Sequence, residues 1–159
     1  PAVAARLLAD GALAEQGALV RQPAFLPHLS PAQQQRADSI LAAITGGGYS
    51  PPSLSDLAVS GAGDTDLLAY LVAQRQIIRL NDQLAYPSTV YREMVERVVA
   101  ALEGGPQTVA QVRDLLQISR RYSLALLEHL DVQRVTRRNG DERTLLRRPE
   151  WQAATQARA

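Results

Sequence analysis

Cysteine and lysine are both absent from this chain of 159 residues, and histidine occurs only twice. Without cysteine there is no disulfide and no thiolate metal site, and His28 and His129 lie too far apart in the sequence to resemble a zinc motif. A P-loop needs a lysine, so that class of nucleotide site is excluded. No apolar run reaches the length of a membrane span, and no charged-then-apolar leader is seen, so we expect a cytoplasmic protein without membrane contact.

The composition, with 46% hydrophobic and 21% charged residues, is typical of a soluble globular protein with one to three small domains. All 17 basic residues are arginine, whose planar guanidinium suits phosphate binding and base stacking. Residues 1–87 hold 5 arginines against 7 acidic residues, whereas residues 88–148 hold 11 against 8. Any nucleic acid should therefore bind the C-terminal part.

A helix is predicted from about Ser119 to Asp131, with Ser119 as its N-cap and two arginines in its first turn. Its N-terminus should attract an anion, because unpaired N–H groups and guanidinium groups meet there. The helical period places one set of residues on the face that packs on the core: Ser123, Leu126, Leu127 and Leu130. Arg120 lies at the edge of this face, and Arg121, Ala125 and Glu128 point away from the core.

Residues 134–146 follow directly and indicate a basic hairpin around Asn139-Gly140, since Asn-Gly is a strong hairpin signal. A helix followed by such a hairpin is typical of a winged helix, in which helix and wing contact a nucleic acid from two sides. The alternative is a solvated helix beside an ordinary hairpin.

The hairpin signal recurs, with turns expected at Gln16-Gly17, Asn81-Asp82 and Asn139-Gly140. Helices precede each turn, and Ser30/Gln33, Ser53/Asp56, Asp64 and Thr108/Gln111 have the spacing of helix caps. We therefore predict a mostly α fold with small β hairpins, made of tandem winged-helix domains. The expected parts are the last helix and wing of a preceding domain (1–25), a winged helix (26–87), a second winged helix (88–148) and a tail (149–159) that Trp151 pins to the last domain.

We expect no active site in this fragment, because the acidic residues are scattered over caps and exposed helix faces. The Gly-x-Gly at Gly61 and Gly63 precedes a helix but follows no strand, so we interpret it as a flexible turn. A helix that ends at Gly104-Gly105-Pro106 should bury an apolar stripe (Val90, Met94, Val95, Val98, Val99 and Leu102).

The chain resembles the C-terminal winged-helix region of the bacterial selenocysteine-specific elongation factor, SelB, over roughly residues 7–147. The resemblance is most specific from Ser119-Arg120-Arg121-Tyr122 through residues 126–131 to the stretch ending Asn139-Gly140-Asp141. It implies a fragment of a longer translation factor, covering the end of a second winged helix, then a third and a fourth. Of these, the fourth would bind the selenocysteine-insertion hairpin in mRNA and the third would act as a spacer.

The resemblance further implies that the RNA site is formed or bordered by Arg120, Arg121, Tyr122, Arg137, Arg138 and Arg143. For Tyr122 the residues alone leave two interpretations open, packing at the domain edge or stacking on an unpaired base. The family's GTPase, with its GTP and Mg²⁺, and its contacts with selenocysteinyl-tRNA and the ribosome would belong to missing N-terminal domains. This fragment itself is expected to be a monomer without a cofactor or metal.

Two other functions fit a basic winged helix. A DNA-binding transcription regulator would dimerise and place its helix in a major groove. A protein-interaction scaffold would use the same fold without a nucleic acid. Comparing the affinities for an RNA hairpin and for duplex DNA at one salt concentration would separate the three.

Overall fold

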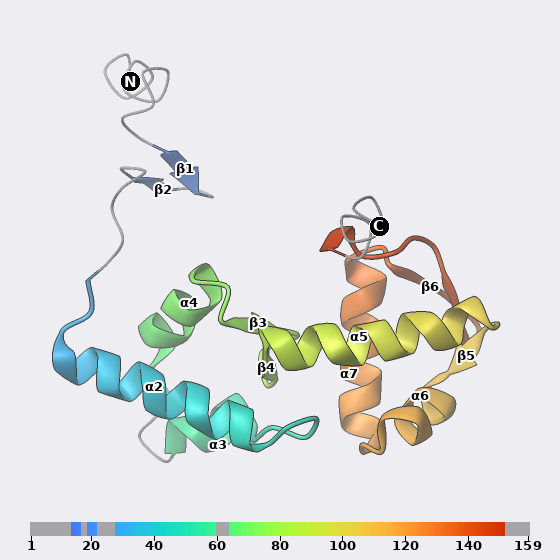
Figure 1. Cartoon of the computed structure of the whole chain (residues 1–159), viewed down its shortest axis with the longest axis horizontal. Helices are drawn as coiled ribbons and strands as arrows, with labels where there is room; N and C mark the ends of the chain where they lie inside the picture. The colour runs from blue at the N-terminus through green and yellow to red at the C-terminus, as the bar shows by residue number, and fades with distance from the viewer. Residues whose placement is uncertain (1–13, 17–18, 22–27, 60–63, 152–159) are drawn as a thin grey trace. The chain divides into compact units, whose positions relative to one another are not determined.

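The computed structural model describes residues 14–16, 19–21, 28–59 and 64–151, and it divides into two compact units at Gln34/Gln35 (Figure 1). The first unit contains an antiparallel hairpin of β1 (Ala14–Gln16) and β2 (Leu19–Arg21), in which Gln16 pairs with Leu19. The predicted hairpin is therefore confirmed in its two strands, while its turn lies outside the described residues. The helix predicted over 1–10, the glycine turn at 60–63 and the tail after residue 151 lie outside the described residues.

The second unit contains helix, helix, helix and hairpin twice in succession, as predicted. The first set is α2 (Pro31–Gly46, which begins before the unit boundary), α3 (Leu54–Val59), α4 (Thr65–Ala73), β3 (Ile77–Arg79) and β4 (Ala85–Pro87). The second is α5 (Ser88–Glu103), β5 (Gln107–Thr108), α6 (Val109–Leu116), α7 (Arg120–Val132), β6 (Thr136–Asn139) and β7 (Glu142–Leu145). We use the labels spacer domain and C-terminal domain for the described residues of 26–87 and 88–148; their separation into two domains and the role of the first stay predictions, because the described residues from Gln35 onward belong to one compact unit.

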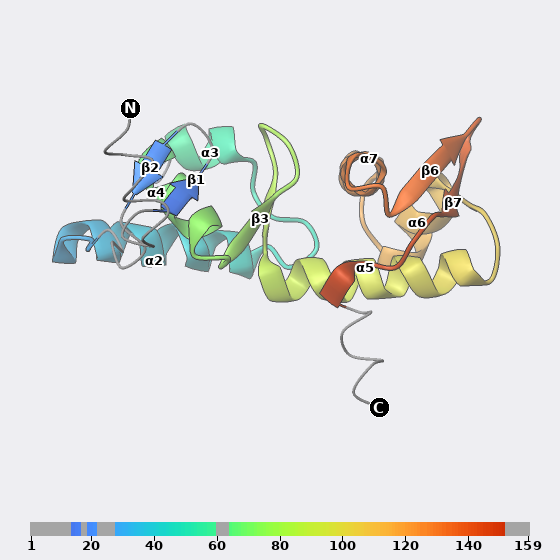
Figure 2. The same cartoon turned by 90° about the horizontal axis from the view of Figure 1, so that it is seen from above.

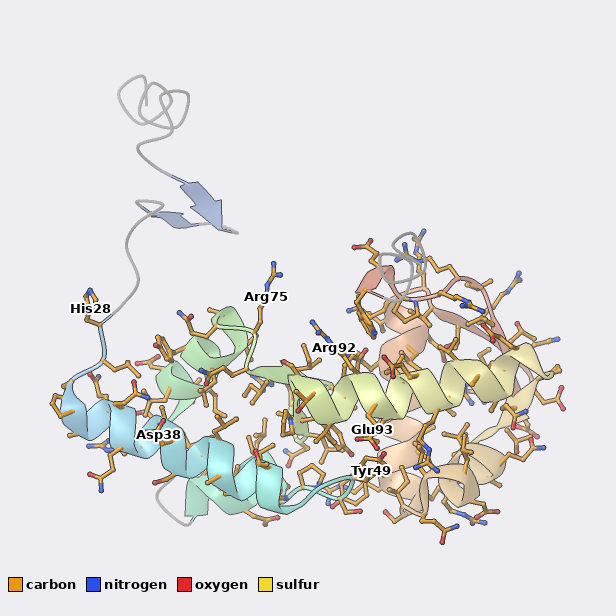
Figure 3. The ribbon with its side chains drawn as sticks, viewed as in Figure 1. His28, Asp38, Tyr49, Arg75, Arg92 and Glu93 are labelled. Atoms are coloured by element: carbon orange, nitrogen blue, oxygen red, sulfur yellow. The ribbon has the colours of Figure 1, made fainter. Side chains whose placement is uncertain are left out.

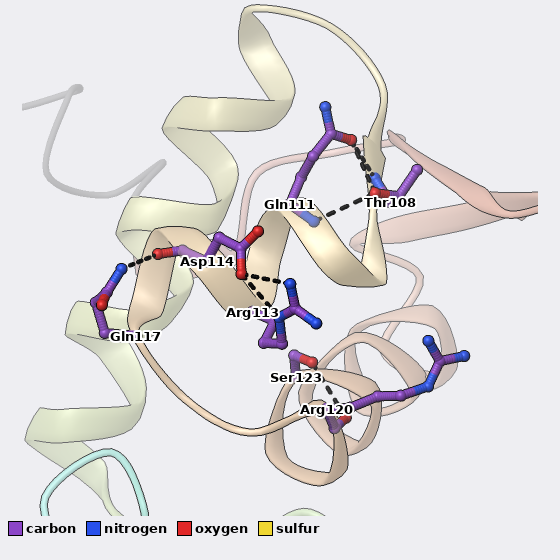
Figure 4. Close-up of polar contacts among 7 residues, drawn as sticks. All are labelled: Thr108, Gln111, Arg113, Asp114, Gln117, Arg120 and Ser123. Atoms are coloured by element: carbon purple, nitrogen blue, oxygen red, sulfur yellow. Dashed lines mark hydrogen bonds and ion pairs between the residues drawn. The ribbon is translucent and has the colours of Figure 1, made fainter.

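Helix starts follow the predicted caps closely. At α6 the Gln111 N–H donates to Thr108 Oγ1 at 3.2 Å, and the Thr108 N–H donates to Gln111 Oε1 at 2.8 Å (Figure 4). Asp64 accepts from the first-turn N–H groups of α4. The prediction for Ser119 was only half right, because it occupies the N-cap of α7 with an extended backbone but its side chain makes no cap hydrogen bond.

The two domains also end their third helices in the same way. Arg75 after α4 and Arg134 after α7 both adopt a left-handed backbone, with φ of 56° and 55°. The next residue then donates its N–H back to a leucine carbonyl, from Gln76 to Leu71 and from Val135 to Leu130, at 3.0 Å in both. This reversal turns the chain directly from helix into wing. The internal repeat predicted from the hairpin turns therefore extends to the backbone of the helix ends.

Each domain buries the apolar face of its helices. The spacer core contains Ala37, Ile40, Ile44, Leu54, Leu57, Leu67, Leu71, Ile77 and Leu84. In the C-terminal domain the predicted stripe of α5 is buried except for Val90, which is half-buried, and Tyr91, which was not predicted, joins it. Trp151 packs against this core with its ring centroid 5.8 Å from that of Tyr91, so the predicted pinning of the tail is confirmed. Within the described ranges, no helix is both long and apolar enough to cross a bilayer.

The spacer and C-terminal domains are joined without a linker, because β4 ends at Pro87 and α5 begins at Ser88. The Ser88 N–H donates to Gln76 O at 2.9 Å, which ties the start of α5 to the base of the spacer hairpin. The loop after α2 is attached to α5 by a hydrogen bond from Tyr49 to Glu93, two side chains that lie together in Figure 3. Figure 2 shows α5 extending from β3 to the C-terminal wing.

Candidate nucleic-acid interface

The C-terminal wing is a three-stranded sheet in the order β5-β7-β6, with β7 in the centre. In the register of β6 and β7, Thr136 faces Leu145 and Arg138 faces Arg143. Because side chains alternate along a strand, these four residues share one face of the sheet and Arg137 lies on the other. Thr136 and Arg143 are buried, so their face is turned toward the helices.

Asp131 near the end of α7 connects that helix to the wing. Its Oδ1 accepts a hydrogen bond from Thr136 Oγ1 at 2.6 Å, and its Oδ2 lies 3.4 Å from Arg143 Nε. The Arg143 side chain is only 2% exposed and that of Asp131 is 24% exposed. One carboxylate therefore compensates a buried guanidinium and fixes both wing strands relative to α7.

The sequence analysis lists Arg143 among the residues that form or border the RNA site, and that role stays a prediction. Its position in β7 turns its side chain inward, where it is buried. Arg137 and Arg138 are exposed as expected, and Arg138 donates from Nε to Gly140 O at 2.9 Å, which holds its side chain along the turn of the wing.

A hollow of about 370 Å³ lies between the wing, the start of α7 and the start of α6. Its charged lining consists of three arginines, Arg120, Arg138 and Arg143, and one aspartate, Asp141. Thr108, Val109 and Ala110 contribute the N-terminal end of α6, and Leu124 completes the lining. The structure thus brings together Arg120 and Arg138, which are 18 positions apart in the sequence, around one positively charged depression. The α6 end of it was missed by sequence reasoning, although the Thr108 capping box marked the start of that helix.

The other flank of α7 faces the spacer domain. Tyr122 donates its hydroxyl hydrogen to Pro51 O at 3.0 Å, so the packing interpretation of this tyrosine is supported over base stacking. The guanidinium carbon of Arg121 lies 5.7 Å from the centre of the Tyr122 ring. Hydrogen bonds from Ser53 lower the pKa of Asp56, and the positive charge of Arg121 contributes to this shift. Arg121 is therefore exposed at the border between the two domains, away from the hollow that Arg120 lines.

The expectation that Ala125 points into solvent was wrong. Ala125 is 6% exposed, and together with Leu80 and Asn81 of the spacer hairpin it lines a smaller hollow of about 240 Å³. His129 lies beside it, where burial lowers its pKa and a hydrogen bond with the Leu80 backbone opposes that shift. Of the three residues that the helical wheel assigns to solvent, Arg121 and Glu128 are exposed as expected and only Ala125 is buried.

Parts of the chain are similar to known proteins. Residues 100–145, which span the end of α5, α6, α7 and most of the wing, match the family model described as elongation factor SelB, winged helix. The chain is 23% identical over 148 residues to the selenocysteine-specific elongation factor of Desulfomicrobium baculatum. The C-terminal part of the chain is thus similar to a SelB winged helix. The match covers 90% of this chain but only 23% of that relative.

Solved structures agree with the SelB-type fold. A bacterial selenocysteine-specific elongation factor, EF-Sec, aligns with 91% of this chain and 23% of its own length, at a TM-score of 0.62 and 17% identity. The mRNA-binding domain of E. coli SelB, solved in complex with SECIS RNA, aligns with 74% of this chain and 98% of its own length, at a TM-score of 0.61 and 24% identity. At these identities the structural matches establish the tandem winged-helix fold.

In the part of the chain that the structure describes, no three histidine or acidic side chains gather as a metal site would require. The six residues expected at an RNA site divide into three groups: Arg120 and Arg138 at the hollow, Arg121 and Tyr122 at the domain border, and Arg137 on the outer face of the wing, with Arg143 buried beneath. Their contacts with RNA stay a prediction.

Proposed function

We propose that this chain is the mRNA-hairpin-binding module of a selenocysteine-specific elongation factor and tethers that factor to its message. The observation that carries the proposal is the depression lined by Arg120 and Arg138 on a SelB-type winged helix. Exposed guanidinium groups on a helix start and on a wing suit the phosphates and splayed bases of an RNA loop, whereas the grooves of an RNA duplex offer side chains little to read.

The similarity to an E. coli domain that was solved with SECIS RNA supports the same ligand class. The chain spans about a quarter of the length of its curated relative, so the wider activity of such a factor is also a proposal for this protein. Selenocysteinyl-tRNA, the ribosome, GTP and Mg²⁺ would be bound by parts of the protein outside this span. For the span itself we propose a monomeric RNA-binding role in the cytoplasm without a cofactor.

The test is a comparison of ligands at one fixed salt concentration. The chain is titrated with RNA stem-loops carrying a randomised loop and with a duplex DNA of equal length. We expect a subset of the RNA hairpins to bind more tightly than the DNA, because only an open loop presents unstacked bases. Tighter binding to DNA would favour the transcription-regulator alternative, and binding to neither would favour the protein scaffold.

Substitution of Arg138 by alanine tests the placement of the site. Losing one phosphate contact should reduce the slope of log affinity against log salt by about 0.7 to 0.9. Folding should be unchanged, since the Arg138 side chain is exposed. The matched control is Arg79→Ala on the spacer hairpin, which should leave both affinity and slope as they are. If the control weakens RNA binding and Arg138→Ala does not, the surface has been assigned to the wrong domain.

A further inference from the structure

Another hollow, of about 410 Å³, lies between β3, the end of α7 and residues 147–151, and we call it the aromatic pocket. Its volume is within the range of about 300 to 1,000 Å³ that small-molecule sites occupy. The hollow at the wing borders Arg120 and Leu124 near the start of α7, whereas the aromatic pocket borders Gln133 and Val135 just after its end. The two are therefore separate surfaces at opposite ends of one helix.

The walls of the aromatic pocket favour a flat ring. The Tyr91 ring centroid lies 5.5 Å from that of His129, with the two planes at 90°, and 5.8 Å from that of Trp151. Aliphatic side chains of the spacer domain, among them Val72 and Ile77, add to the lining. Val72 is 39% exposed, so part of this apolar surface is in contact with water. A planar ring that enters the pocket would remove this surface from water and pack against the aromatic side chains.

Polar groups in the same lining suit a ring that has hydrogen-bonding atoms at its edge. Gln133 is exposed and carries an amide, which both donates and accepts. Burial lowers the pKa of His129, so its imidazole is neutral at pH 7, with one nitrogen as donor and the other as acceptor. The edges of nucleobases combine donors and acceptors in the same way, and a glutamine amide can pair with such an edge. The pocket therefore favours a heteroaromatic base over a plain hydrocarbon ring.

The rim of the pocket is positively charged. Arg79 and Arg147 line it together with one acidic residue, Glu150. Arg79 is already paired with Asp82 at 3.1 Å, whereas the contact of Arg147 with Glu150 is long, at 3.9 Å, and Glu150 is 92% exposed. The Arg147 guanidinium donates from Nη2 to Gln133 O at 3.1 Å, which holds its charge beside that residue. An anionic group attached to a bound ring would therefore be attracted to Arg147.

We propose that the aromatic pocket binds a nucleoside monophosphate, with its base against the three rings and its phosphate on Arg147. The base edge pairs with the Gln133 amide. A peptide with an aromatic and an acidic side chain would fit the walls and the rim but has no such edge. Binding of a nucleotide here does not depend on the proposed mRNA-binding function. A free nucleotide and an unpaired nucleotide of an RNA have the same chemistry, and the experiment separates these two sources.

The fluorescence of Trp151 reports on the pocket directly, because the chain has no other tryptophan. The whole chain is titrated with each of the ribonucleoside 5′-monophosphates of adenine, guanine, cytosine and uracil, and N-acetyltryptophanamide corrects for absorption by the bases. We expect a saturable change with at least one nucleotide. Ribose 5-phosphate, which has no base, and phenyl phosphate, whose ring has no hydrogen-bonding edge, should bind about tenfold more weakly or worse. If no nucleotide gives a saturable change, or if phenyl phosphate binds as tightly as the best nucleotide, the proposal is wrong.

The test variant is Arg147→Gln, which removes the cation at the rim. The Arg147 side chain is 56% exposed, so the fold should be kept. The best nucleotide should bind this variant about tenfold more weakly, while the nucleoside without its phosphate should bind parent and variant equally. The matched control is Arg148→Gln, which removes the neighbouring arginine outside the pocket lining and should leave nucleotide affinity as it is. Equal nucleotide affinity of Arg147→Gln and the parent would overturn the placement of the phosphate.

A competition identifies the source of the nucleotide. The best nucleotide is titrated into the chain with and without a saturating RNA stem-loop selected in the ligand comparison. Unchanged nucleotide affinity, which we expect, assigns the pocket to a free nucleotide. Displacement by the RNA, together with weaker RNA binding by Arg147→Gln, keeps the site and assigns it to an unpaired nucleotide of the RNA. A chain that binds the nucleotide but no RNA hairpin would reject the mRNA-binding function and keep the pocket.

Discussion

The pair between Asp131 and Arg143 offers a sharp test of what holds the wing to α7. Replacing Asp131 by asparagine removes the negative charge while keeping the shape of the side chain. The amide oxygen can still accept from Thr136, but Arg143, which is 2% exposed, loses its counter-charge. The substitution therefore isolates the electrostatic part of the contact from its packing.

The expected magnitude follows from the burial of the two partners. Removing one side of a buried ion pair typically costs about 3 to 5 kcal/mol. In this case water reaches the carboxylate, whose side chain is 24% exposed, and the distance of 3.4 Å between Nε and Oδ2 is long for a strong bond. We therefore expect a loss of about 2 to 3 kcal/mol in the free energy of unfolding.

Urea unfolding of the whole chain measures this loss. With a slope of about 1 to 3 kcal/mol per molar urea, the midpoint should fall by about 0.7 to 3 M. The matched control is Asp114→Asn, which breaks an exposed pair with Arg113 drawn in Figure 4 and should cost less than about 0.5 kcal/mol. If the two variants unfold at the same urea concentration, the buried pair does not stabilise the wing and the reasoning fails.

Three further outcomes can be checked. Tyr122→Phe leaves the Pro51 carbonyl without its donor and should cost about 0.5 to 1.5 kcal/mol in urea unfolding, with the salt dependence of RNA binding unchanged. Gly47→Ala should cost about 1 to 3 kcal/mol because its Cβ would lie 2.4 Å from Pro51 Cα, whereas Gly46→Ala, with open space around its Cβ, should cost far less. Burial raises the pKa of Tyr91 from 10.0 to about 12, so the folded state holds this proton more tightly than the unfolded state and loses stability as pH rises from 10 to 12. Burial raises the pKa of Tyr86 as well, so the absorbance of tyrosinate should show a late titration whose amplitude Tyr91→Phe reduces by one tyrosine.

Local signals in the sequence predicted most of the secondary structure correctly. The capping pair of Thr108 and Gln111 and the Asn139-Gly140 turn act over three or four residues, so no knowledge of the rest of the chain is needed to recognise them. The same holds for the repeat of helices and hairpins. These features position Arg120 and Arg138 correctly on a helix start and on a wing.

The errors have different origins. Ala125 was assigned to solvent because a helical period says nothing about the spacer hairpin that covers it. The burial of Arg143 was not anticipated, because it depends on the inner face that Arg143 shares with Thr136 and on the counter-charge that Asp131 supplies from α7. Tyr91 was left out of the core because the stripe was drawn from aliphatic residues alone.

The junction at Ser88 has a mechanical consequence. Strand β4 continues into α5 with no residue between them. Ser88 donates two hydrogen bonds to the turn between α4 and β3, from its N–H to Gln76 O at 2.9 Å and from its hydroxyl to Arg75 O at 2.5 Å. A tension applied to the C-terminal domain along the chain would therefore load these hydrogen bonds before it could extend any loose backbone. If a bound RNA exerts a force on the C-terminal domain, the junction transmits that force to the spacer domain without first extending a linker.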